Sequence, residues 1–225
     1  MNFKNNQGFT LVELAIVLVV VGLLLGSILG PLSAQQKNKN IKKTEQLLNE
    51  IHDAIIGYSA INGFLPCPAT AASNGLESRT AGAGSSCTTE HGFVPAVTLS
   101  INGQFDSNQQ LIDYWASPIR YSLSDVNAWQ FATGLSLNNQ TSPFNVCTNS
   151  TCTVGNVVAQ SVVAVIFSVG PDRNIYNSAD QLENLDADNV FISKFPTELT
   201  GSEFDDIVSW ISPNLLMLQF IQTNL

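Results

Sequence analysis

A single acidic side chain interrupts a long apolar stretch near the start of the chain. Glu13 is the only charged residue between Gly8 and Gly30. On insertion scales a charged side chain inside a membrane helix costs about 2.5–3.5 kcal/mol unless another group pairs with it. The stretch therefore limits what the chain can fold into, and it requires a group that neutralises Glu13.

The apolar stretch has the length of a membrane helix. It covers 22 residues from Phe9 to Gly30, and about 20 residues at 1.5 Å each cross a hydrocarbon core of about 30 Å. The apolar core of a secretory signal peptide is shorter, at about 7–15 residues. A signal-peptidase site after Ala34 is the alternative, but Leu32 fits poorly three residues before that cut. We predict a transmembrane helix over residues 9–30.

Charge is distributed unevenly along the 225 residues. Residues 44–225 contain 17 acidic and four basic residues, a net charge of −13. Nucleic-acid phosphates bind basic surfaces, so nucleic acid is not an expected partner of this acidic part. Metal cations or basic protein surfaces suit it better.

Four lysines follow the apolar stretch (Lys37, Lys39, Lys42 and Lys43) and, by the positive-inside rule alone, would place the C-terminal part in the cytoplasm.

The four cysteines indicate the opposite orientation. An even number of cysteines in an exported domain predicts disulfides, which form in oxidising compartments. Three pairings are possible, and sequence proximity favours Cys67–Cys87 and Cys147–Cys152, because each pair closes a short loop of small polar residues. A zinc site is the alternative. It is disfavoured because the C-x4-C spacing is unusual for zinc and His91 is the only histidine nearby in sequence.

The leader and the start of the apolar stretch resemble a known family. Residues 8–14 read G-F-T-L-V-E-L and follow a short polar leader that contains one lysine. This resembles the processing motif of type IV prepilins and type II secretion pseudopilins. The resemblance implies that prepilin peptidase cuts between Gly8 and Phe9 and that Phe9 becomes N-methylated. It also implies partners, namely other pilin or pseudopilin subunits and an inner-membrane assembly platform.

The resemblance offers two partners for Glu13. Cleavage would give Phe9 a free amino group with a reference pKa of about 7.7–8.0. Residues four apart share a helix face, so Glu13 can neutralise the amine of its own chain. In the family the glutamate is thought to pair with the amine of a neighbouring subunit. Both arrangements require cleavage, and the sequence leaves both open.

A second helical segment is expected over residues 31–63. Pro31 removes an i→i−4 hydrogen bond and is expected to kink the helix, which can resume beyond it. Gly63 is the expected C-cap. The family often has a proline where this chain has Gly30. The apolar positions recur at spacings of three and four with one gap of seven, which predicts an amphipathic helix that packs on a sheet: Ile41, Leu48, Ile51, Ile55 and Tyr58.

The remainder, residues 64–225, reads as one exported β-rich domain. Ser212 and Pro213 are expected to open a helix over Leu215–Ile221. These segments predict an α+β fold with a long N-terminal helix and an antiparallel sheet. This agrees with the pilin-like fold that the resemblance implies for a chain with a leader at residues 1–8. Apolar runs predict its strands: Gly92–Leu99, Pro118–Leu123, Trp129–Thr133, Val157–Val169, Phe191–Ile192 and Ile207–Ile211.

Calcium is the one candidate cofactor. Calcium takes six to eight oxygen ligands, and an acidic loop follows the apolar run Val157–Val169. The loop departs from an EF-hand pattern at Tyr176 and Asn177. Its start and the later Asp205-Asp206-Ile207 also resemble the calcium-binding region of major pseudopilins. An acidic surface loop without metal is the alternative. The partial match places potential ligands at five positions: Asp172, Asn174, Ser178, Asp180 and Glu183.

No enzymatic motif is present. The chain lacks a G-x-S-x-G elbow, a Walker loop and an H-E-x-x-H helix, and it has only two histidines, His52 and His91. The resemblance to prepilins and pseudopilins implies a structural subunit, a minor pilin or pseudopilin, in the bacterial inner membrane with its C-terminal domain periplasmic or extracellular. The alternative is an adhesin-like or ligand-binding domain held by an ordinary uncleaved anchor.

Overall fold

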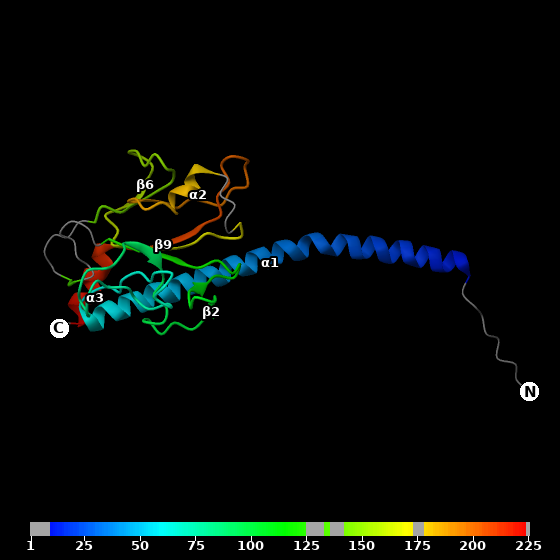
Figure 1. Cartoon of the computed structure of the whole chain (residues 1–225). Coiled ribbons are helices and arrows are strands. Elements are labelled where there is room, and N and C mark those ends of the chain that lie inside the picture. Colours follow the sequence, from blue (N-terminus) through cyan, green and yellow to red (C-terminus); the bar gives the residue numbers. More distant parts are fainter. Residues whose placement is uncertain (1–9, 125–132, 136–141, 173–177, 224–225) are drawn as a thin grey trace, which may run out of the picture. The chain divides into compact units, whose positions relative to one another are not determined.

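The computed structural model describes residues 10–124, 133–135, 142–172 and 178–223, except for the side chains of residues 26–32, 220 and 223. The chain divides into two compact units, residues 1–40 and 41–225. Figure 1 traces the elements from the N-terminal helix α1 to the C-terminal helix α3.

Helix α1 (Leu11–Asn62) is a single 52-residue element and runs through Pro31 without a break. Its end is the predicted one, because Gly63 has a left-handed φ of 75° and its backbone N–H donates to the Ser59 carbonyl at 2.9 Å. Glycine adopts this conformation without the steric cost that a Cβ brings. In the described part of the chain, no helix is long and apolar enough to cross a membrane.

The main sheet has four antiparallel strands in the order β1-β4-β7-β9. They are β1 (His91–Phe93), β4 (Arg120–Leu123), β7 (Ala164–Ser168) and β9 (Ile207–Ile211). The α+β prediction is confirmed, and β9 has the predicted bounds. The prediction for the first strand was too long, since β1 ends at Phe93. Pro95 cannot donate to a ladder, and the chain turns there.

Two smaller sheets complete the β structure. A two-stranded sheet pairs β2 (Gln104–Phe105) with β3 (Leu111–Ile112). A three-stranded sheet has the order β6-β5-β8, with β5 (Asn145–Cys147), β6 (Val157–Gln160) and β8 (Val190–Ile192). Its β5–β8 pair is parallel, which the prediction of an antiparallel sheet did not anticipate.

The apolar run Val157–Val169 was wrongly predicted as one strand. It divides at Ser161, which has a left-handed φ of 54°, into β6 of the small sheet and β7 of the main sheet. β6 alternates between half-buried and exposed residues, whereas all five residues of β7 are buried. The predicted strand Trp129–Thr133 lies outside the described residues except for Thr133, which is in a turn.

The second half of α1 supplies part of the core, as the periodicity predicts. Leu48, Ile51 and Ile55 are 0–2% exposed and belong to one buried cluster with Tyr121 of β4 and Ile211 of β9. Full burial of such a side chain contributes about 1.5–3 kcal/mol. Attachment of this half of α1 to the sheet is therefore a main source of stability in residues 41–225.

A second buried cluster joins the main sheet to the three-stranded sheet. It includes Phe144, Phe167 of β7 and Phe191 of β8. The rings of Phe144 and Phe191 meet edge to face, with centroids 5.2 Å apart. Such pairs add about 0.5–1.5 kcal/mol beyond the buried area.

Helix α3 (Pro213–Thr223) begins at the predicted proline, and the Leu215 N–H donates to Ser212 Oγ at 3.3 Å. A short helix, α2 (Ala179–Glu183), was not predicted, because the sequence there was interpreted as an acidic loop. Its N-cap is Ser178, whose hydroxyl accepts from the Gln181 N–H.

Disulfides join Cys67 to Cys87 and Cys147 to Cys152, with Cα atoms 5.3 and 5.4 Å apart. These are the pairs that sequence proximity favours. All four thiols are used, so the cysteines cannot form the alternative zinc site.

A polar cluster ties the loop of the first disulfide to α1. Glu77 accepts from the Tyr58 hydroxyl at 3.0 Å and from the Cys67 N–H at 3.0 Å. It also forms an ion pair with Arg79 at 2.9 Å, in which the Arg79 side chain is only 4% exposed. Arg79 donates in turn to the Leu65 carbonyl at 2.9 Å. A half-buried carboxylate thus holds the end of the helix, the disulfide and the loop together.

Candidate functional site

Glu13 takes part in a capping box at the start of α1. Its Oε2 atom accepts from the backbone N–H and from the hydroxyl of Thr10, both at 3.1 Å, and the Glu13 N–H donates to Thr10 Oγ1 at 3.2 Å. This reciprocal pattern of a threonine and a glutamate three residues later satisfies donors at a helix start. The capping box was not predicted, although T-x-x-E ahead of an apolar run is its sequence signal. The carboxylate therefore has local partners before any cleavage.

The capping box also shows which part of the chain the Glu13 carboxylate contacts. Gly8 and Phe9 lie outside the described residues. The carboxylate accepts from the backbone nitrogen of Thr10, the residue directly after Phe9. A free amino group created on Phe9 would thus be one residue from the groups that already bind the carboxylate. This position suits neutralisation within one chain and leaves pairing with a neighbour open.

The helix that follows the capping box exposes apolar side chains on all sides. Every residue from Leu11 to Leu25 is exposed, with Leu11 at 85% and Leu23 at 72%. Soluble monomers rarely expose continuous apolar areas of this kind, which mark contacts with proteins or membranes. The first unit therefore has a surface that requires a partner.

The structure does not bring the predicted calcium ligands together around one centre. The Asp180 carboxylate pairs with Lys194 and accepts from the Ser150 N–H at 2.9 Å. Burial alone would raise the pKa of Asp180, but the bonds from Lys194 and Ser150 hold it below its usual value. Asp172 instead accepts from the Gln181 side chain at 2.8 Å. Asn174 lies outside the described residues.

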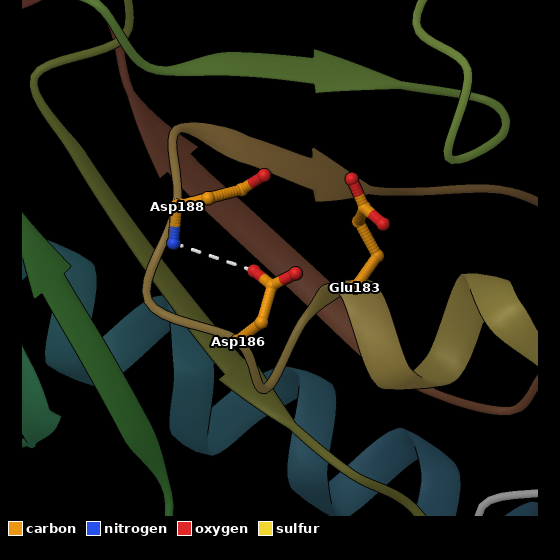
Figure 2. Close-up of side chains that lie close together, drawn as sticks. All are labelled: Glu183, Asp186 and Asp188. Carbon is orange, nitrogen blue, oxygen red and sulfur yellow. Dashed lines mark hydrogen bonds between the residues drawn. The ribbon is translucent and has the colours of Figure 1, made fainter.

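Glu183 joins two other carboxylates (Figure 2). One carboxylate oxygen from each of Glu183, Asp186 and Asp188 lies within 4.8 Å of the others, and the Asp188 N–H donates to Asp186 Oδ1 at 3.3 Å. Burial, followed by the charge of nearby carboxylates, raises the pKa of Glu183 and of Asp186. Oxygen donors of this type suit calcium, but exposed acidic groups are common without a metal.

Asp205 and Asp206 have different partners. Asp205 accepts from the Gln181 side chain at 3.0 Å, and Asp206, which is 6% exposed, accepts from Asn184 Nδ2 at 2.7 Å. Burial raises the pKa of Asp206 to about 7, although the Asn184 bond opposes the shift. Asn184 Oδ1 accepts from the Ile192 N–H at 2.6 Å. These bonds connect α2, β8 and the residues before β9.

His91 is half-buried and lies in a strand. It begins β1, stacks near Phe144 with ring centroids 5.6 Å apart, and its Nδ1 lies 3.0 Å from Ser122 Oγ. Burial lowers the pKa of His91. Ser122 is only 3% exposed, so this pair is poorly placed to meet a substrate. His52 lies 3.4 Å from the Asp53 carboxylate.

Comparison with known families supports the interpretation of the N-terminus. Residues 3–29 match the family model described as the prokaryotic N-terminal methylation motif. The match includes Gly8, Phe9 and Glu13, and it confirms the resemblance of this segment to prepilins and pseudopilins. Comparison with curated proteins and with solved structures found no match.

Proposed function

We propose that this chain is a structural subunit, a minor pilin or pseudopilin, of a type IV pilus or type II secretion filament. The observation that carries the proposal is the methylation motif at residues 3–29, which overlaps the start of a helix whose exposed side chains at residues 14–25 are all apolar. Prepilin peptidase would remove residues 1–8, and residues 9–30 would hold the subunit in the bacterial inner membrane with residues 64–225 exported.

Burial of the apolar helix favours both its insertion into the membrane and its assembly into a filament. Burial of one leucine or valine side chain contributes about 1.5–3 kcal/mol, and residues 11–25 contain twelve leucine, isoleucine and valine side chains. Lipid covers them before assembly, and helices of neighbouring subunits cover them afterwards. A subunit can therefore move from membrane to filament without exposing the helix to water, delivered by an inner-membrane assembly platform.

Hydrogen bonds from Thr10 lower the cost of keeping the Glu13 carboxylate in this helix. Before cleavage, Thr10 supplies two donors to the carboxylate. After cleavage, the Phe9 amine supplies a positive charge next to these donors, in the same chain or in a neighbour. Assembly favours the neighbour if the stagger of adjacent helices places its amine against the capping box.

Mass spectrometry of the mature N-terminus tests the proposal. We expect a chain that begins with N-methyl-phenylalanine at Phe9. An intact Met1 would contradict the proposal and favour a domain on an uncleaved anchor, and a start near Gln35 would indicate signal-peptidase cleavage.

A Glu13→Ala variant tests the role of the carboxylate. We expect cleavage between Gly8 and Phe9 to continue while incorporation into filaments is lost. Thr10→Val is the matched control, because it removes the hydroxyl of the capping box but keeps the carboxylate. Normal incorporation of Glu13→Ala would show that the carboxylate is not needed for assembly.

A further inference from the structure

The main sheet ends differently at its two edges. At the first edge, Phe93 of β1 is covered by the chain itself, because Ala69 exchanges two backbone hydrogen bonds with it, at 2.8 and 2.9 Å. Gly92 permits this approach, since a Cβ there would lie 2.4 Å from the Ala69 carbonyl oxygen. At the opposite edge, β9 pairs only with β7 among the described residues. The sheet is therefore closed at one edge and open at the other.

The open edge has two residues whose backbone groups face away from β7. The Ile211 carbonyl accepts from the Val163 N–H at 2.9 Å, so the backbone of Ile211 faces β7. Hydrogen-bonding direction alternates along an antiparallel strand, so Ser209 also faces β7, whereas Val208 and Trp210 face outward. Within the part of the chain that the structure describes, the backbone groups of Val208 and Trp210 have no hydrogen-bond partner. The edge thus presents two N–H donors and two carbonyl acceptors.

β9 lacks the features that normally prevent pairing at an edge. Natural edge strands are protected by charged residues, proline or a bulge, but Ile207–Ile211 reads I-V-S-W-I and contains neither charge nor proline. Its register with β7 continues over all five residues without a shift. Four of the five residues are only half-buried. A further strand therefore has both backbone groups to bond and apolar side chains to cover.

Charge indicates which kind of strand fits this edge. Three acidic residues immediately precede β9, namely Glu203, Asp205 and Asp206, and residues 195–225 contain no lysine or arginine. A strand that pairs with β9 in the antiparallel direction brings its C-terminal end beside these acidic residues. A basic residue at that end would match their charge. The corresponding segment of a second copy has no basic residue to place there.

Backbone geometry restricts the partner further. Outward groups on Val208 and Trp210 are two residues apart, a spacing that an extended main chain matches when it adds a strand to an open edge. We propose that β9 binds an extended segment of another protein as an additional antiparallel strand. This segment is uncharged opposite Ile207–Ile211 and basic at its C-terminal end. The contact goes beyond the proposed function, because it concerns a partner of residues 41–225 and not the N-terminal end of α1.

A labelled peptide that copies Val163–Ser168 and ends in two lysines tests the contact. Its last five copied residues are those of β7, which pair with β9 on the inner side. In the same register on the outer side, the two lysines lie beside Asp206 and Asp205. We expect the peptide to bind the full chain in detergent, measured by fluorescence anisotropy, and to slow hydrogen exchange at the amides of Val208 and Trp210. No binding at millimolar peptide, or unchanged exchange at both amides, would overturn the proposal.

Two altered peptides separate backbone pairing from adhesion of side chains. N-methylation at the positions that copy Val165 and Phe167 removes the N–H groups opposite Trp210 and Val208. Binding should weaken at least about tenfold, because two main-chain hydrogen bonds are lost. Replacement of the two lysines by glutamates should weaken binding at least about threefold. Equal binding of the N-methylated peptide would overturn strand addition, and equal binding of the glutamate peptide would overturn the basic end.

A Val208→Pro variant tests the edge from the side of the protein. It removes an outward N–H but no bond to β7, and proline is tolerated at such edge positions. We expect at least about tenfold weaker peptide binding, with urea unfolding close to that of the unchanged chain. Binding to residues 11–25 or to detergent would not change, so retained binding would contradict the assignment to β9. If the variant does not fold, the N-methylated peptide still decides the question with the unchanged chain.

Sedimentation and the mature N-terminus distinguish the remaining outcomes. A dimer of the full chain that dissociates when the peptide is added would assign the edge to a second copy and overturn a partner from another protein. A chain that keeps Met1 would refute the proposed function and leave peptide binding at β9 unchanged. N-methyl-Phe9 without peptide binding would refute strand addition alone.

Discussion

Leu18 and Leu48 occupy the same helix but have opposite environments. Leu18 is 64% exposed, and Leu48 is 2% exposed. Around Leu48 the apolar residues form a stripe that one sheet can cover, whereas around Leu18 they point in all directions. A stripe is satisfied by a single domain. An all-round apolar surface needs lipid or several other chains, so the two parts of α1 are built for intramolecular and intermolecular burial respectively.

The largest effect on folding is expected for Ile51→Ala. Ile51 is fully buried in the cluster between α1 and the main sheet. Truncation of a buried isoleucine leaves a cavity and costs about 2–5 kcal/mol. Urea unfolding of the purified chain in detergent, followed by tryptophan fluorescence, measures the change. A loss below about 1 kcal/mol would contradict the assignment of this half of α1 to the core.

The buried carboxyl group of Asp206 gives the folded unit a pH dependence. Its pKa is about 7 in the folded chain and about 3.9 when unfolded. The folded state therefore binds the proton more tightly, so this contribution is complete below about pH 4 and is lost as pH rises through 7. The free energy of unfolding should fall by up to about 4 kcal/mol between these limits.

Asp206→Asn should remove this dependence, because an amide keeps the shape without titrating. The free energy of unfolding of the variant at pH 5 and pH 8 should differ less than that of the unchanged chain. Asp53→Asn is the control, since the Asp53 side chain is 86% exposed. If the free energy of unfolding changes equally with pH in Asp206→Asn and in the unchanged chain, the pH dependence belongs to another group.

Loss of the Cys67–Cys87 disulfide should cost about 3 kcal/mol, and loss of Cys147–Cys152 about 2 kcal/mol, because the first closes the longer loop. The sequence separations are 20 and 5 residues. Paired serine substitutions and urea unfolding measure both. Neither change should alter the mature N-terminus. A larger loss for the Cys147–Cys152 variant would show that loop length does not set the order.

Leu18→Ala should have the smallest effect on folding, below about 0.5 kcal/mol, because an exposed side chain has no packing to lose within the chain. It should nevertheless reduce incorporation into filaments. The pair Leu18→Ala and Ile51→Ala thus tests the comparison directly. A loss in urea unfolding as large as that of Ile51→Ala would mean that residues 11–25 pack within the chain.

The sequence predicts the parts of the fold that local patterns determine. The stripe at Leu48, Ile51 and Ile55, the cap at Gly63 and the bounds of β9 follow from periodicity and from glycine chemistry. The division of the run Val157–Val169 could not be predicted, since Ser161 gives no strong turn signal. The parallel pairing of β5 with β8 depends on contacts between segments over 40 residues apart.

For the candidate sites, too, the sequence predicts local motifs but not which distant residues come together. The methylation motif is a contiguous signal, and a family model recognises it. The acidic region is compatible in sequence with a calcium site or a metal-free acidic loop, because spacing alone cannot show that Asp180 pairs with Lys194 or that Ser178 caps α2. Glu183 was placed with Asp172 by sequence spacing, whereas the fold places it with Asp186 and Asp188.

The Cys67–Cys87 disulfide requires an oxidising environment to form. The loop from Cys67 to Cys87 contains few apolar residues, so packing alone does little to fix it. The disulfide adds a covalent link to the hydrogen bonds that Glu77 makes with Tyr58 and Cys67, and cytosolic thiols stay reduced. If the domain is exported as proposed, the oxidation state of these cysteines would distinguish an exported chain from one retained in the cytoplasm.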